Sequence, residues 1–169
     1  MENKSKIDPF ELAKWGVLAV GGFLVYKTLR GLGIVKSAEE KKEEQKIKSI
    51  DVGTFAPLSP LYYKNLLTKN KGYPIKILTA NNTKAYIANL LAAKGLINDD
   101  EAVIYRVFNS IPYQSQISYL AAQFNIKTNK DLNTYLTDIL SDSEKIKLIN
   151  IIESKQIGIM DPKTNKVIQ

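Results

Sequence analysis

Acidic side chains are the first candidates for chemistry, because this 169-residue chain contains no Cys and no His. That composition excludes thiolate metal sites, Cys nucleophiles and the commonest general base. A hydrolase would then need two converging carboxylates, as in glycosidases. Glu101, Asp131 and Asp138 are the carboxylates with some structural context, but each also fits a helix cap or a solvated surface. We therefore expect no enzyme, with no catalytic residue, no metal and no cofactor.

A basic and aromatic stretch between residues 62 and 84 is the second candidate site. Its lysines could contact phosphates and its tyrosines could stack on bases. The net charge of +7 also favours acidic partners, either nucleic acid or anionic lipid headgroups, although a Lys-rich surface often serves solubility alone. The simpler alternative places the first tyrosine and Leu66 and Leu67 in the core, with the lysines solvated. The candidate contacts are Tyr62, Tyr63, Lys64, Lys69, Lys71, Tyr73, Lys76 and Lys84.

An apolar segment near the N-terminus predicts a membrane anchor. Residues 15–26 (WGVLAVGGFLVY) are uncharged. As a helix they cover about 18 Å, less than the roughly 30 Å of the hydrocarbon core. Lysines at both ends could lengthen the span by snorkelling, the end aromatics suit the interface, and membranes tolerate the paired glycines. The predicted anchor residues are Lys14, Trp15, Gly21, Gly22, Tyr26 and Lys27.

Three other interpretations of this segment compete with a span. A secretory signal peptide would need a cleavage site of small residues, which the following KTLRGLG does not supply. A helix buried in a soluble domain would carry costly glycines, and an interfacial helix would need a polar face. More Lys and Arg follow the segment than precede it, which favours the C-terminal part on the cytoplasmic or particle-interior side.

Charge and breaker patterns divide the chain into four expected parts. An anchor helix occupies residues 1–35, and a charged helical stalk and linker occupies 36–58. A helical domain fills 59–157, and a tail covers 158–169. Glutamates and lysines of the stalk stand at i,i+3 and i,i+4 spacings, which stabilise a solvated helix. We expect the tail to be either a loosely held end or a β-like arm.

Apolar periodicity predicts an all-α fold, with a compact bundle of about five to six short helices in the domain. Capping side chains mark several starts, at Asp131, at 141–144 (SDSE) and at the cluster Asp99, Asp100 and Glu101. The expected helices cover residues 61–70, 83–94, 102–108, 112–124, 130–140 and 143–154.

Residues 90–152 resemble a single annexin-type repeat, a module also found in proteins of bacteria and their viruses. The likeness rests on the GLINDDE start, the QSQIS and KDLNTYL segments and the LSDSE opening of the last helix. The resemblance implies a compact bundle of about five helices. It does not carry calcium binding over, because the loop after Gly95 lacks a second glycine and Ile139 stands where the liganding acid would be.

These patterns together predict a single-pass membrane protein with a structural or adaptor role. Its helical module would dock a protein partner, such as a capsid protein or another membrane protein, and its other partner would be the lipid bilayer. Small size, an Ile-, Lys- and Asn-rich composition and the lack of catalytic groups are also typical of a minor component of a bacterial-virus particle. The alternative is a membrane-tethered nucleic-acid binder that uses residues 62–84, and oligomerisation stays open.

Overall fold

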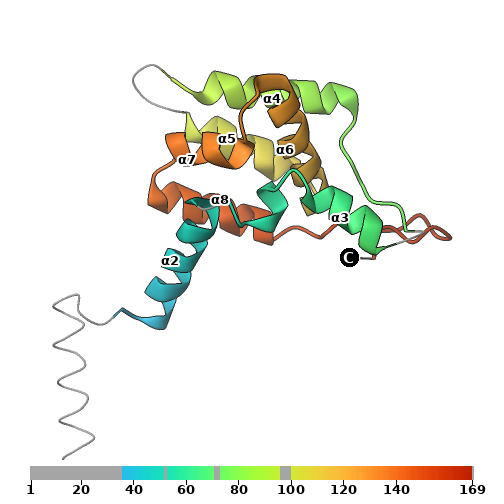
Figure 1. Ribbon diagram of the computed structural model, residues 1–169, viewed down its shortest axis with the longest axis horizontal. Helices are drawn as coiled ribbons and strands as arrows, with labels where there is room; N and C mark the ends of the chain where they lie inside the picture. Colours follow the sequence, from blue (N-terminus) through green and yellow to red (C-terminus); the bar gives the residue numbers. More distant parts are fainter. Residues whose placement is uncertain (1–35, 52, 71–72, 96–99, 169) are drawn as a thin grey trace, which may run out of the picture. The chain divides into compact units, whose positions relative to one another are not determined.

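The computed structural model describes residues 36–168, except residues 52, 71–72 and 96–99. This part of the chain holds seven α-helices, one 3-10 helix and no β-strand, which confirms the all-α prediction (Figure 1). The elements are α2 (Ala38–Asp51), η1 (Ala56–Leu58), α3 (Tyr62–Lys69), α4 (Ala80–Ala93), α5 (Glu101–Ser110), α6 (Gln114–Thr128), α7 (Leu132–Ile139) and α8 (Asp142–Glu153).

The predicted anchor at residues 15–26 lies outside the described residues. Within the described residues, no helix combines the length and the apolar character that crossing a bilayer requires. The chain divides into two compact units, Met1–Lys42 and Glu43–Gln169. The packing described below is that of the second unit.

Capping side chains fix the starts of three helices where the sequence predicted them. Asp100 and Asp131 each accept a first-turn backbone N–H at 3.1 Å, at the starts of α5 and α7. Ser141 and Glu144 form a capping box at the start of α8. These bonds satisfy backbone donors that the first helical turn leaves without partners.

Helix α4 begins three residues earlier than the sequence predicted. Thr79 is its N-cap and accepts the Asn82 N–H at 3.3 Å, so the helix starts at Ala80 rather than at Thr83. Thr83 is instead buried, and its hydroxyl donates to the Thr79 carbonyl at 2.8 Å. Apolar spacing does not reveal this first turn, because the small Ala80 is followed by two polar residues, Asn81 and Asn82.

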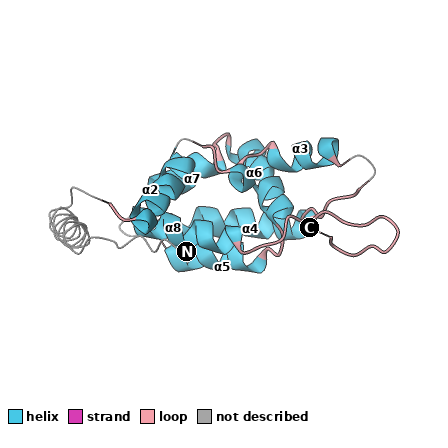
Figure 2. Ribbon diagram, turned by 90° about the horizontal axis from the view of Figure 1, so that it is seen from below, coloured by secondary structure: helices cyan, strands magenta, loops and turns pink. Residues whose placement is uncertain are grey.

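Helix α6 lies at the centre of the bundle. It contacts α3, α4, α7 and η1, and seven of its residues are buried, Phe124 completely. In Figure 2, α4, α5 and α8 lie together on one side and α3 and α7 on the other. Because neighbours cover α6 on several faces, its sequence carries only a weak amphipathic signal.

The C-terminal half of α2 belongs to the core of the helical domain. Ile50 and Leu58 are fully buried, and the Asn133 side-chain amide donates to the Ile50 carbonyl. Lys145, which is itself buried, pairs with Asp51 at 2.8 Å. The core therefore includes Ile50 and Leu58 from the end of the segment 36–58, which was expected to be a stalk and linker outside the helical domain, whereas none of residues 36–48 is buried.

A β-like arm follows α8, rather than a loosely held end. Gly158, Ile159 and Met160 are buried. Ile159 forms an antiparallel bridge with Ile75, and Met160 forms one with Val167. The arm thus pairs with the segment that connects α3 and α4.

Candidate functional site: the α4–α6 groove

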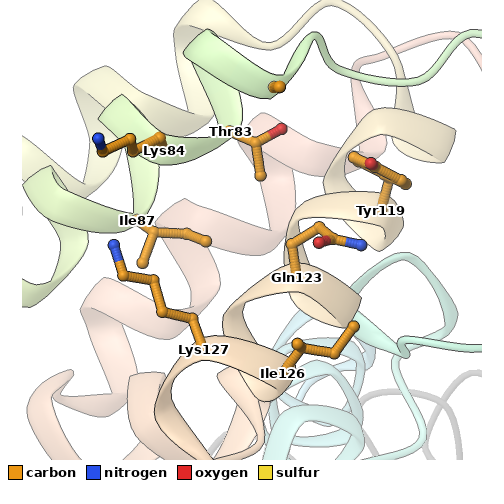
Figure 3. Close-up of a pocket in the computed structure, with 8 residues that line it drawn as sticks. Thr83, Lys84, Ile87, Tyr119, Gln123, Ile126 and Lys127 are labelled. Atoms are coloured by element: carbon orange, nitrogen blue, oxygen red, sulfur yellow. The ribbon is translucent and has the colours of Figure 1, made fainter.

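A groove of about 230 Å³ lies between α4 and α6. Figure 3 shows its two walls, with α4 residues on one side and α6 residues on the other. We call it the α4–α6 groove. Its lining residues are Ala80, Thr83, Lys84 and Ile87 from α4, and Tyr119, Gln123, Ile126 and Lys127 from α6.

Helical periodicity places these residues in the groove. Positions three, four and seven apart share one face of a helix, and the four α4 residues follow that spacing from Ala80 to Ile87. The α6 residues follow the same rule from Tyr119 to Lys127. Both walls are therefore continuous helix faces held by the core beneath them.

The charges of the two helices meet at the groove. Neither α4 nor α6 contains Asp or Glu, and each has a single charged residue, Lys84 in α4 and Lys127 in α6. Both lysines line the groove. Within the described part of the chain, neither ammonium group forms an ion pair. The groove is consequently positive and favours an anionic ligand.

Apolar surface adjoins the two lysines. Ile87 lies at the base of the groove and is 2% exposed, whereas Ile126 at its edge is 75% exposed. Leu91, four residues after Ile87 on the same face of α4, is 40% exposed. Scattered exposed apolar residues are ordinary, but two large ones beside a groove favour a binding surface.

The polar residues of the groove offer recognition rather than catalysis. The Thr83 hydroxyl is already engaged within α4, and the Tyr119 ring packs edge-on against Tyr63, with 5.5 Å between ring centroids. Figure 3 shows the Lys127 side chain reaching from α6 toward Ile87 of α4. The lining residues include no carboxylate, so the groove supplies no acid–base pair. It can hold a molecule that is partly apolar and partly anionic.

The structure places the predicted nucleic-acid contacts at several different sites. Tyr62 is half-buried, its hydroxyl donates to Gln114 Oε1 at 3.4 Å, and burial raises its pKa. The Tyr63 backbone N–H donates to Ser118 Oγ at 3.0 Å. The Tyr63 side chain reaches the groove only through its contact with Tyr119. These two tyrosines thus help to fix α3 on α6.

The lysines of the same stretch are also dispersed. Lys64 and Lys69 are exposed on α3, and Lys76 is half-buried in the segment before α4, where its carbonyl accepts Ser115 Oγ at 2.7 Å. Lys84 is the one predicted lysine that lines the groove, and Lys71 lies outside the described residues. Tyr73, also in this stretch, is exposed.

The candidate carboxylates do not converge. Asp131 caps α7, Glu101 lies in the first turn of α5, and Asp138 is exposed on α7. Ile139, at the position that a calcium-liganding acid would occupy in the resemblance, is buried in the core. No group of three potential metal ligands occurs among the described residues.

Sequence reasoning identified Lys84 but missed the α6 wall of the groove. Gln123, Ile126 and Lys127 lie about forty positions after the α4 residues, and no local pattern connects the two segments. One signal was available in the sequence: α6 has a single charged residue among fifteen, and Ile126 stands next to it. Comparison of the chain with protein-family models, with curated proteins and with solved structures gives no match, and the annexin-type resemblance stays a prediction.

Proposed function

We propose that this chain is a non-enzymatic, membrane-tethered adaptor whose helical domain docks a protein partner in the α4–α6 groove. One observation carries the proposal: the only charged residues of α4 and α6 are two lysines that meet at a groove edged by the exposed Ile126. A surface of this kind binds well without chemistry, since apolar burial supplies affinity and charge supplies selectivity.

Docking of a protein fits the groove better than binding of nucleic acid does. Affinity for a phosphate backbone grows with the number of cations that contact it, and the groove offers two. Tyr62 and Tyr63, the expected stacking residues, are engaged with α6. Ile126 and Leu91 instead provide apolar area, which a protein side chain can cover.

The tether is the part of the proposal that rests on sequence alone. Residues 15–26 are apolar and bracketed by Lys14 and Lys27, as expected for a short bilayer anchor. Alkaline carbonate extraction of membranes tests it, with the full chain compared to a variant that lacks residues 1–35. We expect the full chain to stay with the membrane and the shortened one to be released. Equal release of the two would exclude the anchor.

The docking site is tested by photo-crosslinking in cells that express the full chain. A photoreactive amino acid replaces Ile126, the most exposed residue of the groove. We expect one discrete crosslinked protein, which is lost when Lys84→Glu and Lys127→Glu are introduced together.

Arg106→Glu is the matched control for that double variant. Arg106 is an exposed α5 residue that lines a separate hollow of about 150 Å³ with Tyr86 and Asn89 of α4. The charge reversal is of the same kind, but the α4–α6 groove is untouched. A crosslinked band that persists in the lysine variant, or that disappears equally in the control, would contradict docking at the groove.

A further inference from the structure

We infer that the occupant of the α4–α6 groove is an acidic amphipathic helix of the partner protein. The inference rests on the proposed docking function and specifies the chemistry of the partner. It combines the shape of the groove, its charge and the position of its exposed apolar residues.

The shape of the groove favours a helix. Two neighbouring helix faces form its walls, and ridges of side chains at i,i+3 and i,i+4 spacings accept the ridges of a third helix. From Ala80 to Ile87 the α4 wall covers about 10 Å, or roughly two helical turns, and the exposed Leu91 lies one turn further along the same face. Ala88, three residues before Leu91, is exposed and has a short side chain.

An extended peptide fits these walls less well than a helix. Binding by strand addition requires a free backbone edge. The backbone of α4 and α6 is hydrogen-bonded within each helix instead, and the lining side chains are the surface that a ligand meets. The β-like bridges of the domain join residues of other segments, such as Ile75 and Ile159.

The charge of the groove favours carboxylates on the partner. Lys84 and Lys127 extend from opposite walls, and no acid on either helix offsets them. Their aliphatic stems can lie along an apolar ligand while the ammonium groups meet acids at its edge. A helix with Glu or Asp flanking a Leu-rich face fits both the charge and the apolar surface, because the acids meet the lysines while the leucines cover the exposed Ile126 and Leu91.

The inference is tested with synthetic peptides and the full chain in detergent micelles. One probe is a helical peptide of about fifteen residues that separates Leu from Glu on two faces. A second has Lys in place of each Glu, and a third is a scrambled acidic peptide of identical composition. Fluorescence anisotropy measures binding at low and at physiological salt, and circular dichroism reports whether the bound peptide is helical.

We expect the amphipathic acidic peptide alone to bind the unmodified chain. Lys84→Glu with Lys127→Glu should weaken that binding at least about tenfold and should create binding of the Lys peptide. Arg106→Glu should leave the affinity within about twofold, because Arg106 lies outside the groove. Ile126→Ser should weaken binding without any change of charge, since it removes an apolar contact. Circular dichroism of each variant confirms that the domain still folds.

Four results would overturn the inference. Equal binding of the scrambled peptide would show that binding does not require an amphipathic helix face. If the Lys84→Glu and Lys127→Glu variant neither loses the acidic peptide nor binds the Lys peptide, the two lysines do not determine binding. Displacement of the peptide by a single-stranded oligonucleotide at equal concentration would assign the groove to nucleic acid. If crosslinking at Ile126 succeeds while every peptide fails, docking stands and the acidic helix is wrong; if both fail, the proposed function is wrong as well.

Discussion

Tyr105 is the residue whose ionisation depends most clearly on the fold. Its side chain is 7% exposed, its hydroxyl donates to the Glu144 carbonyl at 3.4 Å, and Lys147 Nζ lies 4.3 Å from its ring centroid. Burial, together with the negative charges of Glu144 and Glu101, raises the pKa of Tyr105 to about 12. The folded domain therefore holds this phenol neutral at a pH where an unfolded chain would ionise it.

A pH-dependent stability follows from this raised pKa. The favourable contribution is complete below the unfolded value of 10.0 and is lost as the pH rises toward about 12. We expect Tyr105→Phe to lose less stability than the unmodified domain between these limits, by roughly 1–3 kcal/mol. Urea unfolding at a series of alkaline pH values measures the difference. Parallel pH profiles for the two proteins would contradict it.

At the residue scale, roles that a residue performs within its own helix could be predicted from the sequence, whereas roles that depend on a distant partner could not. The caps Asp100, Asp131 and Ser141 were predictable, because a cap acts on backbone within its own first turn. The presence of Lys84 and Lys127 in one groove was not predictable, since it depends on how α4 and α6 pack. Lys145 was missed for the same reason: its partner Asp51 lies 94 positions away.

The β-like arm requires a residue without a side chain at Gly158. Its φ is +97°, and an added Cβ would lie 2.4 Å from Ser115 Oγ and 2.8 Å from the Tyr113 Cβ. The same serine hydroxyl donates to the Lys76 carbonyl, which joins the arm's surroundings to the segment before α4. The close approach of the arm to the start of α6 therefore requires glycine here.

We expect Gly158→Ala to destabilise the domain by about 2–4 kcal/mol, from steric overlap together with backbone strain. Gly53→Ala is the matched control. Gly53 also has a positive φ, +69°, but its added Cβ would make only an ordinary 3.8 Å contact with Asn133. Gly53→Ala should lower the free energy of unfolding by roughly 1–2 kcal/mol. Thermal or denaturant unfolding compares the two, and equal losses would show that the overlap is relieved.

Helix α2 provides the second test at the element scale. Ile50 is fully buried in the core cluster, whereas Lys48 on the same helix is exposed. Ile50→Ala should cost about 2–4 kcal/mol, because it leaves a cavity in the core. Lys48→Ala should stay within about 0.5 kcal/mol. Denaturant unfolding measures both, and a small loss for Ile50→Ala would mean that α2 does not contribute to the core.

The elements themselves were largely predictable, and their packing was not. Helices α3 to α8 occur near their expected positions, since apolar spacing and caps act within a few residues. The charged composition of residues 36–48 suggested a solvated helix. None of residues 36–48 is buried, in agreement with that suggestion, whereas Ile50 at the C-terminal end of the same helix is buried in the core.

At the scale of the whole molecule, both ends of the helical domain depend on partners distant in sequence. The Asn133 side chain bonds to Ile50 across 83 positions, and Lys46 pairs with Glu153 across 107. The arm adds the bridge between Ile75 and Ile159. Pairings of this kind are set by three-dimensional packing, which explains why the all-α class was predictable from sequence while the extent of the core was not.

The docking of α2 also has a kinetic consequence. Contacts that close long loops usually form after local helix contacts have assembled a nucleus. Ile50→Ala and Gly158→Ala should therefore leave the refolding rate nearly unchanged and increase the unfolding rate by most of the stability loss. Stopped-flow measurements against denaturant concentration separate the two rates, and a refolding rate that falls in step with stability would place these contacts in the nucleus. The lifetime of the folded domain is then governed by α2 and the arm rather than by the helices at its centre.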